Sequence, residues 1–392
     1  MFSPRFIFFI LWGVQVLLHV GFHKIFFEFD AVTWFAIFFG ILSFNAGTLF
    51  VTCFPGLQSS SLSLSLAEEQ FFDMDRYFYV FISVYSIAAI YAIHSIYGLM
   101  ISGGLEEFSA PLIREFVVDD FSGDRVLYGF FKILYLGVGF SIFFLAFAKS
   151  LSGRQLAMIL VIGLISAVAT TGRLFLLLFF TAAISLLHRG RIISTRGVVL
   201  FLLAFLSLFF VIALIFKKGG ESGSVVENIL WNAQVYFMSS VACFNDFVIS
   251  GSQQIDGGAL LPNPAREMAG IFGYYIPLRA ALNPFAEVPL PCNTYTVLFP
   301  LFHDGGLWGV AAGMLFIGGF HQYLYEKYKN TNSPVWWYLY GISIYPLVMS
   351  IFEDAYFSSF GFWLLLWVPV VFYLIARKIG WISVATPSIE SK

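Results

Sequence analysis

The chain has 392 residues, of which 59% are hydrophobic and only 11% are charged, and its formal net charge at pH 7 is −2. A soluble globular protein carries about 25% charged residues, so this composition excludes that class. We therefore expect an integral membrane protein. Because backbone groups in lipid must be hydrogen-bonded within the segment, we expect an all-α, polytopic transmembrane helical bundle.

Ten apolar segments approach the roughly 20 residues that a helix needs to cross a bilayer. They are 6–22, 31–53, 77–99, 127–148, 156–171, 174–188, 197–216, 305–325, 335–352 and 359–376. The first segment follows Arg5, as in a signal peptide, but no small-residue cleavage site follows it, so we expect a retained span. The chain then divides into spans 1 to 7 with short loops (1–216), one large, partly helical, substrate-binding outer loop (217–304), and spans 8 to 10 with a cytoplasmic tail (305–392).

Lysine and arginine in short loops predict the orientation, because such loops stay in the cytoplasm. The basic loops lie at 149–154, 189–196, 327–329 and 377–378. We therefore expect both termini inside, in a cytoplasmic (inner) membrane, with the active face periplasmic or extracellular. The outer loops would be 100–126, 217–304 and 353–358, and the first of them is acidic, with Glu106, Glu107, Asp119, Asp120 and Asp124.

Arg173 is the one full charge in the apolar run 156–187. Basic loops flank this run at both ends, so we expect both ends on the cytoplasmic side and a turn at Thr170-Thr171-Gly172. Each arm has roughly 15 residues, or about 23 Å of helix, which would place Arg173 near the outer lipid headgroups. A charge at that depth is by default a functional hypothesis. The alternative is an arginine that snorkels to lipid phosphates and anchors the hairpin.

The predicted outer loop holds seven of the fourteen prolines, which favours an irregular, shaped surface. Its stretch NILWNAQVYFMSSVACFNDFV predicts an amphipathic helix lying on the bundle or in the membrane interface. A second stretch, REMAGIFGYYIPLRAALNPF, sets Arg266 and Arg279 among aromatic residues. Together with Arg173 they would suit an anionic ligand, since guanidinium binds phosphate bidentately. Each of the two fits an ordinary surface residue equally well.

The stretch NTYTVLFPLFHDGGLWG leads from the outer loop into the eighth predicted span. Three polar side chains at its start, Asn293, Tyr295 and Thr296, are candidate contacts for sugar or diphosphate. His303 and Asp304 follow at the mouth of the span.

Several groups are candidates for a general base on the outer face. His303 and Asp304 suit a base with a helper, a proton relay or a helix cap, and Asp304 fits an N-cap as well as it fits a catalytic carboxylate. Glu353 and Asp354 occupy the last short outer loop and are available at the same level. The sequence does not choose among His303, Asp304 and Glu353.

This pattern resembles the oligosaccharide repeat unit polymerases, the O-antigen polymerases of Wzy type. The resemblance covers most of the chain in its architecture, with about ten spans and one large outer loop late in the sequence. It is sharpest at TTGRLFLL and at an Asn-x-Tyr-Thr element followed by Asp-x-Gly-x-x-Gly, which stand here as Thr170–Leu177, Asn293–Thr296 and Asp304–Gly309. The resemblance implies that Arg173 and, less directly, Arg266 and Arg279 are essential. In the related O-antigen ligases a histidine acts near the outer end of a late span, and His303 is its counterpart here, although its local pattern differs.

The resemblance also implies a reaction and its partners. A growing glycan on undecaprenyl diphosphate would be the donor and a single repeat unit on a second undecaprenyl diphosphate the acceptor, in lipopolysaccharide or related surface polysaccharide biosynthesis. Arginines would stabilise the leaving diphosphate, and a carboxylate or histidine would take the hydroxyl proton. We expect membrane lipid and a chain-length regulator as further partners, and no cofactor, no metal and no nucleic acid.

Two other functions stay open. A ligase-type glycosyltransferase would share the chemistry but use a different acceptor. A flippase or transporter of lipid-linked oligosaccharide would usually show internal repeats and polar residues near the bilayer midplane, and the sequence has no convincing repeat. Among the three cysteines, Cys243 and Cys292 share the predicted outer loop and an oxidising compartment, and the sequence leaves a disulfide between them open.

Overall fold

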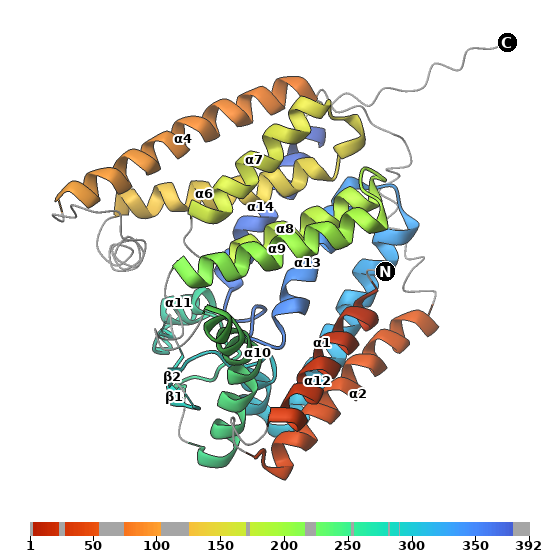
Figure 1. The fold of residues 1–392 in the computed structure, drawn as a ribbon, viewed down its shortest axis with the longest axis vertical. Helices are drawn as coiled ribbons and strands as arrows, with labels where there is room; N and C mark the ends of the chain where they lie inside the picture. Colours follow the sequence, from red (N-terminus) through yellow and green to blue (C-terminus); the bar gives the residue numbers. More distant parts are fainter. Residues whose placement is uncertain are drawn as a thin grey trace. The chain divides into compact units, whose positions relative to one another are not determined.

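The computed structural model describes residues 3–22, 28–54, 74–102, 125–169, 173–215, 225–251, 255–280, 283–289 and 291–378. These residues are mostly helical, with one hairpin of two-residue strands, and the chain separates into two compact units that we describe one at a time (Figure 1). Each of the ten segments predicted as a span coincides with a helix. Four helices, α1, α2, α12 and α14, are long and apolar enough to cross a membrane, and shorter apolar helices accompany them in the described ranges.

The first unit comprises Met1–Leu62, Lys218–Asn330 and Ser343–Leu364. Its elements are α1 (Pro4–Phe22), α2 (Ala31–Cys53), α10 (Val225–Ser250), α11 (Asn263–Ile271), β1 (Ala286–Glu287), β2 (Pro291–Cys292) and α12 (Leu298–Asn330). The two strands pair antiparallel, with Ala286 opposite Cys292. Helices α13 (Pro334–Met349) and α14 (Phe360–Lys378) each contribute residues to both units.

Helices α2 and α12 pack with their backbones in contact. A β-carbon at Gly47 would collide with the carbonyl oxygen of Leu315, and one at Gly318 would collide with the carbonyl oxygen of Phe44. Helices in lipid gain little from the hydrophobic effect when they associate, so small residues that permit close approach are the usual means of packing. These glycines therefore fix how α2 and α12 lie side by side.

Helix α12 turns sharply at Gly306, whose backbone angles (φ 55°, ψ −145°) are non-helical and belong to a region that glycine adopts readily. The residues before the turn lie against those after it. The Leu301 carbonyl faces Gly309, where a β-carbon would strike it, and the Leu301 side chain faces Gly313. The predicted boundary between loop and span at residues 304–305 thus falls beside a real break, although the helical run begins earlier, at Leu298.

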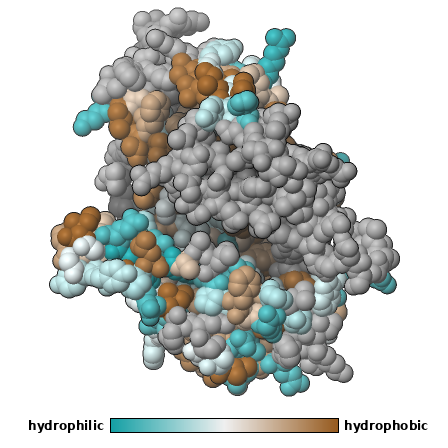
Figure 2. All heavy atoms as spheres, turned by 90° about the vertical axis from the view of Figure 1, so that its left-hand side faces the viewer, coloured by the Kyte–Doolittle hydropathy of each residue, from teal (hydrophilic) through white to brown (hydrophobic). Residues whose placement is uncertain are grey.

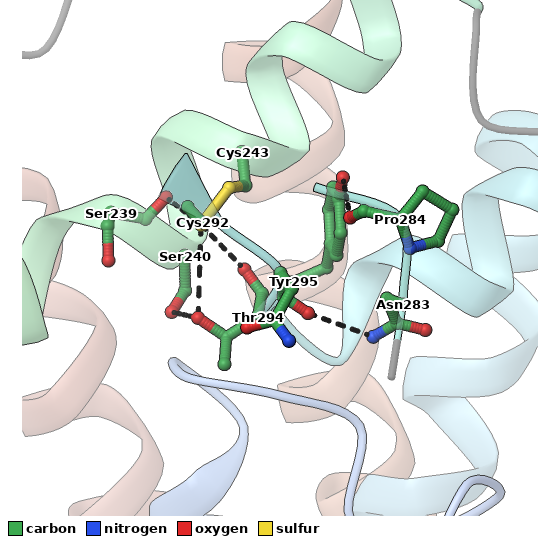
Figure 3. Close-up of a disulfide and its surroundings, with 9 residues drawn as sticks. Ser239, Ser240, Cys243, Asn283, Pro284, Cys292, Thr294 and Tyr295 are labelled. Atoms are coloured by element: carbon green, nitrogen blue, oxygen red, sulfur yellow. Dashed lines mark hydrogen bonds between the residues drawn. A yellow bond between two sulfur atoms is a disulfide. The ribbon is translucent and has the colours of Figure 1, made fainter. Parts of the chain in front are cut away.

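Helix α10 confirms the amphipathic helix predicted between the spans, and it packs with α1 and α2. Its residues Met238, Val241 and Phe244 are fully buried in the core of this unit. A disulfide joins Cys243 on α10 to Cys292 on β2, with the two Cα atoms 6.5 Å apart (Figure 3). The pairing that the sequence left open is therefore present, and it ties α10 to the chain that leads into α12.

The second unit comprises Ser63–Lys217, Thr331–Ile342 and Leu365–Lys392. Its elements are α4 (Met74–Ser102), α6 (Arg125–Leu145), the 3-10 turn η1 (Ala148–Ser150), α7 (Gly153–Ala169), α8 (Arg173–Arg189) and α9 (Thr195–Ile215), with parts of α13 and α14. Helices α7 and α8 confirm the predicted pair around Arg173, and they pack against each other. A β-carbon at Gly163 on α7 would collide with the ring of Phe179 on α8. The predicted turn residues 170–172 and the acidic residues of the 100–126 loop named above, Glu106 to Asp124, lie outside the described residues.

We predict that Gly47→Ala destabilises the protein by about 1 to 3 kcal/mol, because the added methyl group overpacks a backbone contact. Thermal unfolding in one detergent, followed by circular dichroism, measures the effect. Gly13→Ala on α1 is the matched control, since a β-carbon there meets nothing within 4 Å. Equal melting temperatures for the two variants would show that the α2–α12 contact is not as close as described.

Candidate functional site

The first turns of α12 hold the chain that precedes α11. The Asp304 carboxylate accepts hydrogen bonds from the backbone N–H groups of Ala259 (2.7 Å) and Leu260 (2.8 Å). The neighbouring His303 ring accepts one from the N–H of Ile255 through Nε2 (3.0 Å), and its Nδ1 lies 2.5 Å from Asp304 Oδ1. We call these two side chains and the three amides the α12 anchor. It fixes residues 255–260 on the first turn before Gly306.

The α12 anchor gives His303 and Asp304 a structural role, while their proposed role as general base stays a prediction. A backbone N–H can only donate, so His303 Nε2 is the acceptor and the proton of the neutral ring sits on Nδ1, facing Asp304. Both ring nitrogens are thus used within the protein. The Asp304 carboxylate is also occupied by two amides and the imidazole. In this conformation the pair holds a loop, and His303 has no ring nitrogen left to accept a proton from a substrate hydroxyl.

Arg266 lies inside the loop rather than on its surface, with 1% of the residue exposed. Its guanidinium donates only to backbone carbonyls: Nε to Leu261 (2.9 Å), Nη1 to Asp256 and Pro277 (both 2.6 Å), and Nη2 to Gly258. An arginine caged in this way cross-links segments before and after α11. The expectation that Arg266 contacts an anionic substrate is therefore replaced by a structural role.

Arg279 has a different environment. Its Nη1 donates to the Ala259 carbonyl (2.9 Å) and its Nη2 to Asn283 Oδ1 (2.8 Å). A guanidinium carries five N–H donors, so in the part of the chain that the structure describes the remaining donors of this half-buried side chain are not used. Two hydrogen bonds thus hold the Arg279 guanidinium in place, and its remaining N–H groups point to no acceptor among the described residues. An anion-binding arginine needs such N–H groups.

Asn263 and Asn283 hold Arg279, and the sequence interpretation missed both. Asn263 Oδ1 accepts from the Arg279 backbone N–H (2.8 Å), and Asn263 Nδ2 donates to the Arg279 carbonyl (3.0 Å). Asn283 binds the guanidinium and also donates to the Asn293 carbonyl (3.3 Å). Each of these asparagines precedes a proline. The repeated Asn-Pro pair, which marks turns, was the available signal.

Glu353 and Asp354 lie in the loop between α13 and α14. Val297 donates its N–H to the Ser350 carbonyl (3.0 Å), which ties the start of this loop to the start of α12. The Asp354 carboxylate accepts from three backbone N–H groups, those of Tyr356, Phe357 and Ser358, at 2.9 to 3.0 Å. The Glu353 carboxylate accepts no hydrogen bond from any residue that the structure describes. Of these two adjacent acids, Asp354 closes the loop, whereas Glu353 keeps a carboxylate to which no described residue donates.

The charges of Arg279, Glu353 and Asp354 lie close enough to affect one another. Burial raises the pKa of Glu353, the negative charge of Asp354 raises it further, and Arg279 opposes the rise, which leaves a pKa of about 7. Burial lowers the pKa of Arg279, and the charge of Asp354 opposes that change, but an arginine stays protonated. A cation with unused donors therefore stands near a carboxyl group that can exchange its proton at neutral pH.

The three polar residues predicted as substrate contacts take different places. Tyr295 is buried, its ring stacks on Phe299 with centroids 4.5 Å apart, and its hydroxyl donates to the Pro284 carbonyl (3.1 Å; Figure 3). Thr296 is buried and its Oγ1 accepts from the N–H of Leu298 (3.3 Å) at the start of α12. Both therefore build the fold, contrary to prediction. Asn293 is half-buried and is linked to Arg279 through Asn283.

Arg173 begins α8 in the second unit, so it stands at the helix end that the sequence predicted. The sites named above all belong to the first unit, whereas Arg173 belongs to the second. Its role stays a prediction. Among the described residues, no group of three or more His, Cys, Asp or Glu side chains could hold a metal ion.

The fold and the site define a helical protein with helices long and apolar enough to cross a membrane, and with a cation and an acid on a loop-built surface. Comparisons with protein-family models, with curated proteins and with solved structures found no match.

We predict that Asp304→Ala frees the 255–260 segment, because the amides of Ala259 and Leu260 lose their acceptor at a cost of about 1 to 3 kcal/mol. Hydrogen exchange followed by mass spectrometry should show faster exchange across these residues. Asp256→Ala is the control, since that side chain is exposed and only its carbonyl is used. Unchanged exchange in Asp304→Ala would refute the α12 anchor.

Proposed function

We propose that this protein polymerises lipid-linked oligosaccharide repeat units by glycosyl transfer at the outer face of a cytoplasmic membrane. The observation that carries the proposal is that Arg279 and Glu353 lie close enough for their charges to interact. Arg279 keeps N–H groups that no described residue accepts, and the Glu353 carboxyl group accepts no hydrogen bond from the described residues. Diphosphate release and deprotonation of a sugar hydroxyl require those two kinds of group. The resemblance of the sequence to Wzy-type polymerases supports the same reaction.

Arg279 would bind the diphosphate of the donor. Its guanidinium is oriented by Asn283 and by the Ala259 carbonyl, so it need not reorganise when charge develops on the leaving group. Guanidinium also matches the geometry of phosphate oxygens better than an ammonium group does. Asn293, attached to the same network, would contact the sugar or the diphosphate.

Glu353 would act as the general base. The acceptor hydroxyl oxygen attacks the anomeric carbon of the donor and a new glycosidic C–O bond forms. The bond between the anomeric carbon and the phosphate oxygen breaks, and the lipid diphosphate leaves with the electron pair. The hydroxyl proton passes to the Glu353 carboxylate, whose pKa near 7 suits this exchange.

The membrane arrangement is part of the proposal. The apolar segments give ten spans. The basic short loops then place both termini in the cytoplasm and the site at the outer face. Arg173, at the start of α8, would lie at the depth of lipid phosphates and bind a lipid-linked diphosphate there.

The test is complementation in the source cell with this gene removed, reading lipid-linked and surface saccharides on a gel. The wild-type chain should restore a ladder of lengths. Arg279→Ala and Glu353→Gln should reduce it to single repeat units, because leaving-group stabilisation or proton removal contributes about 100-fold or more to such rates. Arg279→Lys, which keeps the charge, should give an intermediate result.

Controls at matched membrane levels are Arg196→Ala, an exposed arginine at the start of α9, and Glu287→Gln, an exposed acid on β1. Both should give a full ladder. A normal ladder without the gene would refute polymerisation. A normal ladder from Arg279→Ala or Glu353→Gln would refute this site while leaving polymerisation standing. Arg173→Ala tests that residue separately, and a full ladder would make it a lipid anchor.

A further inference from the structure

The segment 268–278, which includes the end of α11, exposes apolar side chains although it contains no charged residue. Six of its side chains are between 58% and 89% exposed: Met268, Ile271, Phe272, Tyr274, Tyr275 and Leu278. The face that carries α11 in Figure 1 is drawn in Figure 2, where hydrophobic side chains reach the surface beside hydrophilic ones. Contiguous exposed apolar surface of this kind marks a binding surface.

At the tip of this segment, the backbone N–H groups of residues 272–274 are hydrogen-bonded to carbonyls of the segment itself. After α11 ends at Ile271, the N–H groups of Phe272 and Tyr274 donate to the Ala269 carbonyl (3.0 and 2.9 Å), and that of Gly273 donates to the Gly270 carbonyl (3.1 Å). Gly273 has φ +85°, which permits the tight turn. A loop that enters an apolar medium must bond its N–H groups internally in this way.

The position of the segment relative to a membrane-crossing helix is also fixed. The α12 anchor holds Ala259 and Leu260 on Asp304, three residues before α11 begins at Asn263. Arg266 then ties α11 to the carbonyl of Gly258, which precedes the helix, and to that of Pro277, near the end of the segment. Trp308, 81% exposed, lies just after the turn of α12. The segment is therefore tethered to the end of a helix long and apolar enough to cross a membrane.

We propose that residues 268–278 insert into the outer interface of the lipid bilayer and hold the loop that carries Arg279 at the membrane surface. Ile271 and Phe272 would reach the acyl chains. Tyr274 and Tyr275 would lie at headgroup level, where amphipathic aromatic rings concentrate. The bilayer is favoured as occupant because the segment is tethered through Asp304 to a helix long and apolar enough to cross a membrane, and because it carries no charge with which to select a protein partner. This inference does not depend on the proposed reaction.

The test places an environment-sensitive fluorophore on the segment. In a Cys53→Ser background, Cys243 and Cys292 remain bonded, so a single introduced cysteine can be labelled with nitrobenzoxadiazole. Tyr275→Cys is compared with Glu287→Cys, an exposed site on β1 of the same unit, in nanodiscs of synthetic phospholipid without any polyprenyl lipid. Phe272→Cys serves as a second site on the segment, in case one variant fails to fold.

The label at 275 or 272 should emit at shorter wavelength than the label at 287, and lipids with a nitroxide near the headgroup should quench it about twofold or more. Emission like that at 287 would overturn the proposal. A shift to shorter wavelength without quenching by nitroxide lipid would also overturn it, because protein would then cover the segment. Quenching or a shift that appears only after polyprenyl diphosphate is added would assign the segment to the substrate chain instead.

Discussion

The loop between α10 and α11 in the first unit depends on one set of hydrogen bonds, the α12 anchor. Asp304 and His303 turn the backbone of residues 255–260 so that its N–H groups point to α12. The carbonyls of the same stretch then point the other way: that of Gly258 binds Arg266, and that of Ala259 binds Arg279. Hydrogen bonds to a charged acceptor are stronger than those to a neutral one. Here the Asp304 carboxylate fixes the backbone stretch whose carbonyls position both arginines.

The anchor in turn depends on glycines. Gly306 permits the turn that brings Asp304 to the end of α12, and Gly309 allows the Leu301 carbonyl to approach. Gly258 has φ +86°, and a β-carbon there would crowd Asp304 Oδ2. The Asp-x-Gly-x-x-Gly spacing that carried the resemblance therefore has a physical meaning in this fold. It encodes a turn at Gly306, an acceptor at Asp304 and a close approach at Gly309.

The helices could be read from the sequence because their signal is local. Apolar runs bounded by basic or turn residues predicted ten segments, and each of them coincides with a helix. The predicted boundary at 304–305 falls beside the turn at Gly306, although the helical run begins earlier, at Leu298. The site could not be read in the same way. Arg266 and Arg279 stand in similar aromatic surroundings in the sequence. Only the fold reveals that the Arg266 guanidinium is surrounded by backbone carbonyls, whereas Arg279 keeps N–H groups that no described residue accepts. The partners of both arginines lie within the same loop, but the irregular path of its backbone, and not a regular spacing, decides which carbonyls face each guanidinium.

The same argument separates the acids. His303 and Asp304 looked like a base and its helper, but amides some 45 residues earlier occupy them. Glu353 and Asp354 are neighbours, yet three amides bind one and no described residue donates to the other. Burial and the adjacent charge then raise the pKa of Glu353 without the hydrogen bonds that would lower it. The proposed reaction therefore rests on the polar groups that no described residue binds, at Arg279 and Glu353.

The central claim, that Glu353 is the base of a transfer assisted by Arg279, is tested most directly by the pH dependence of transfer in purified protein supplied with lipid-linked oligosaccharide. Only the ionised carboxylate accepts a proton, so the wild-type rate should rise with pH, about tenfold per unit below the pKa, and level off above about 7. Glu353→Gln should be slow and lack this rise. A Glu353→Gln protein with the wild-type rate and pH profile would contradict the account.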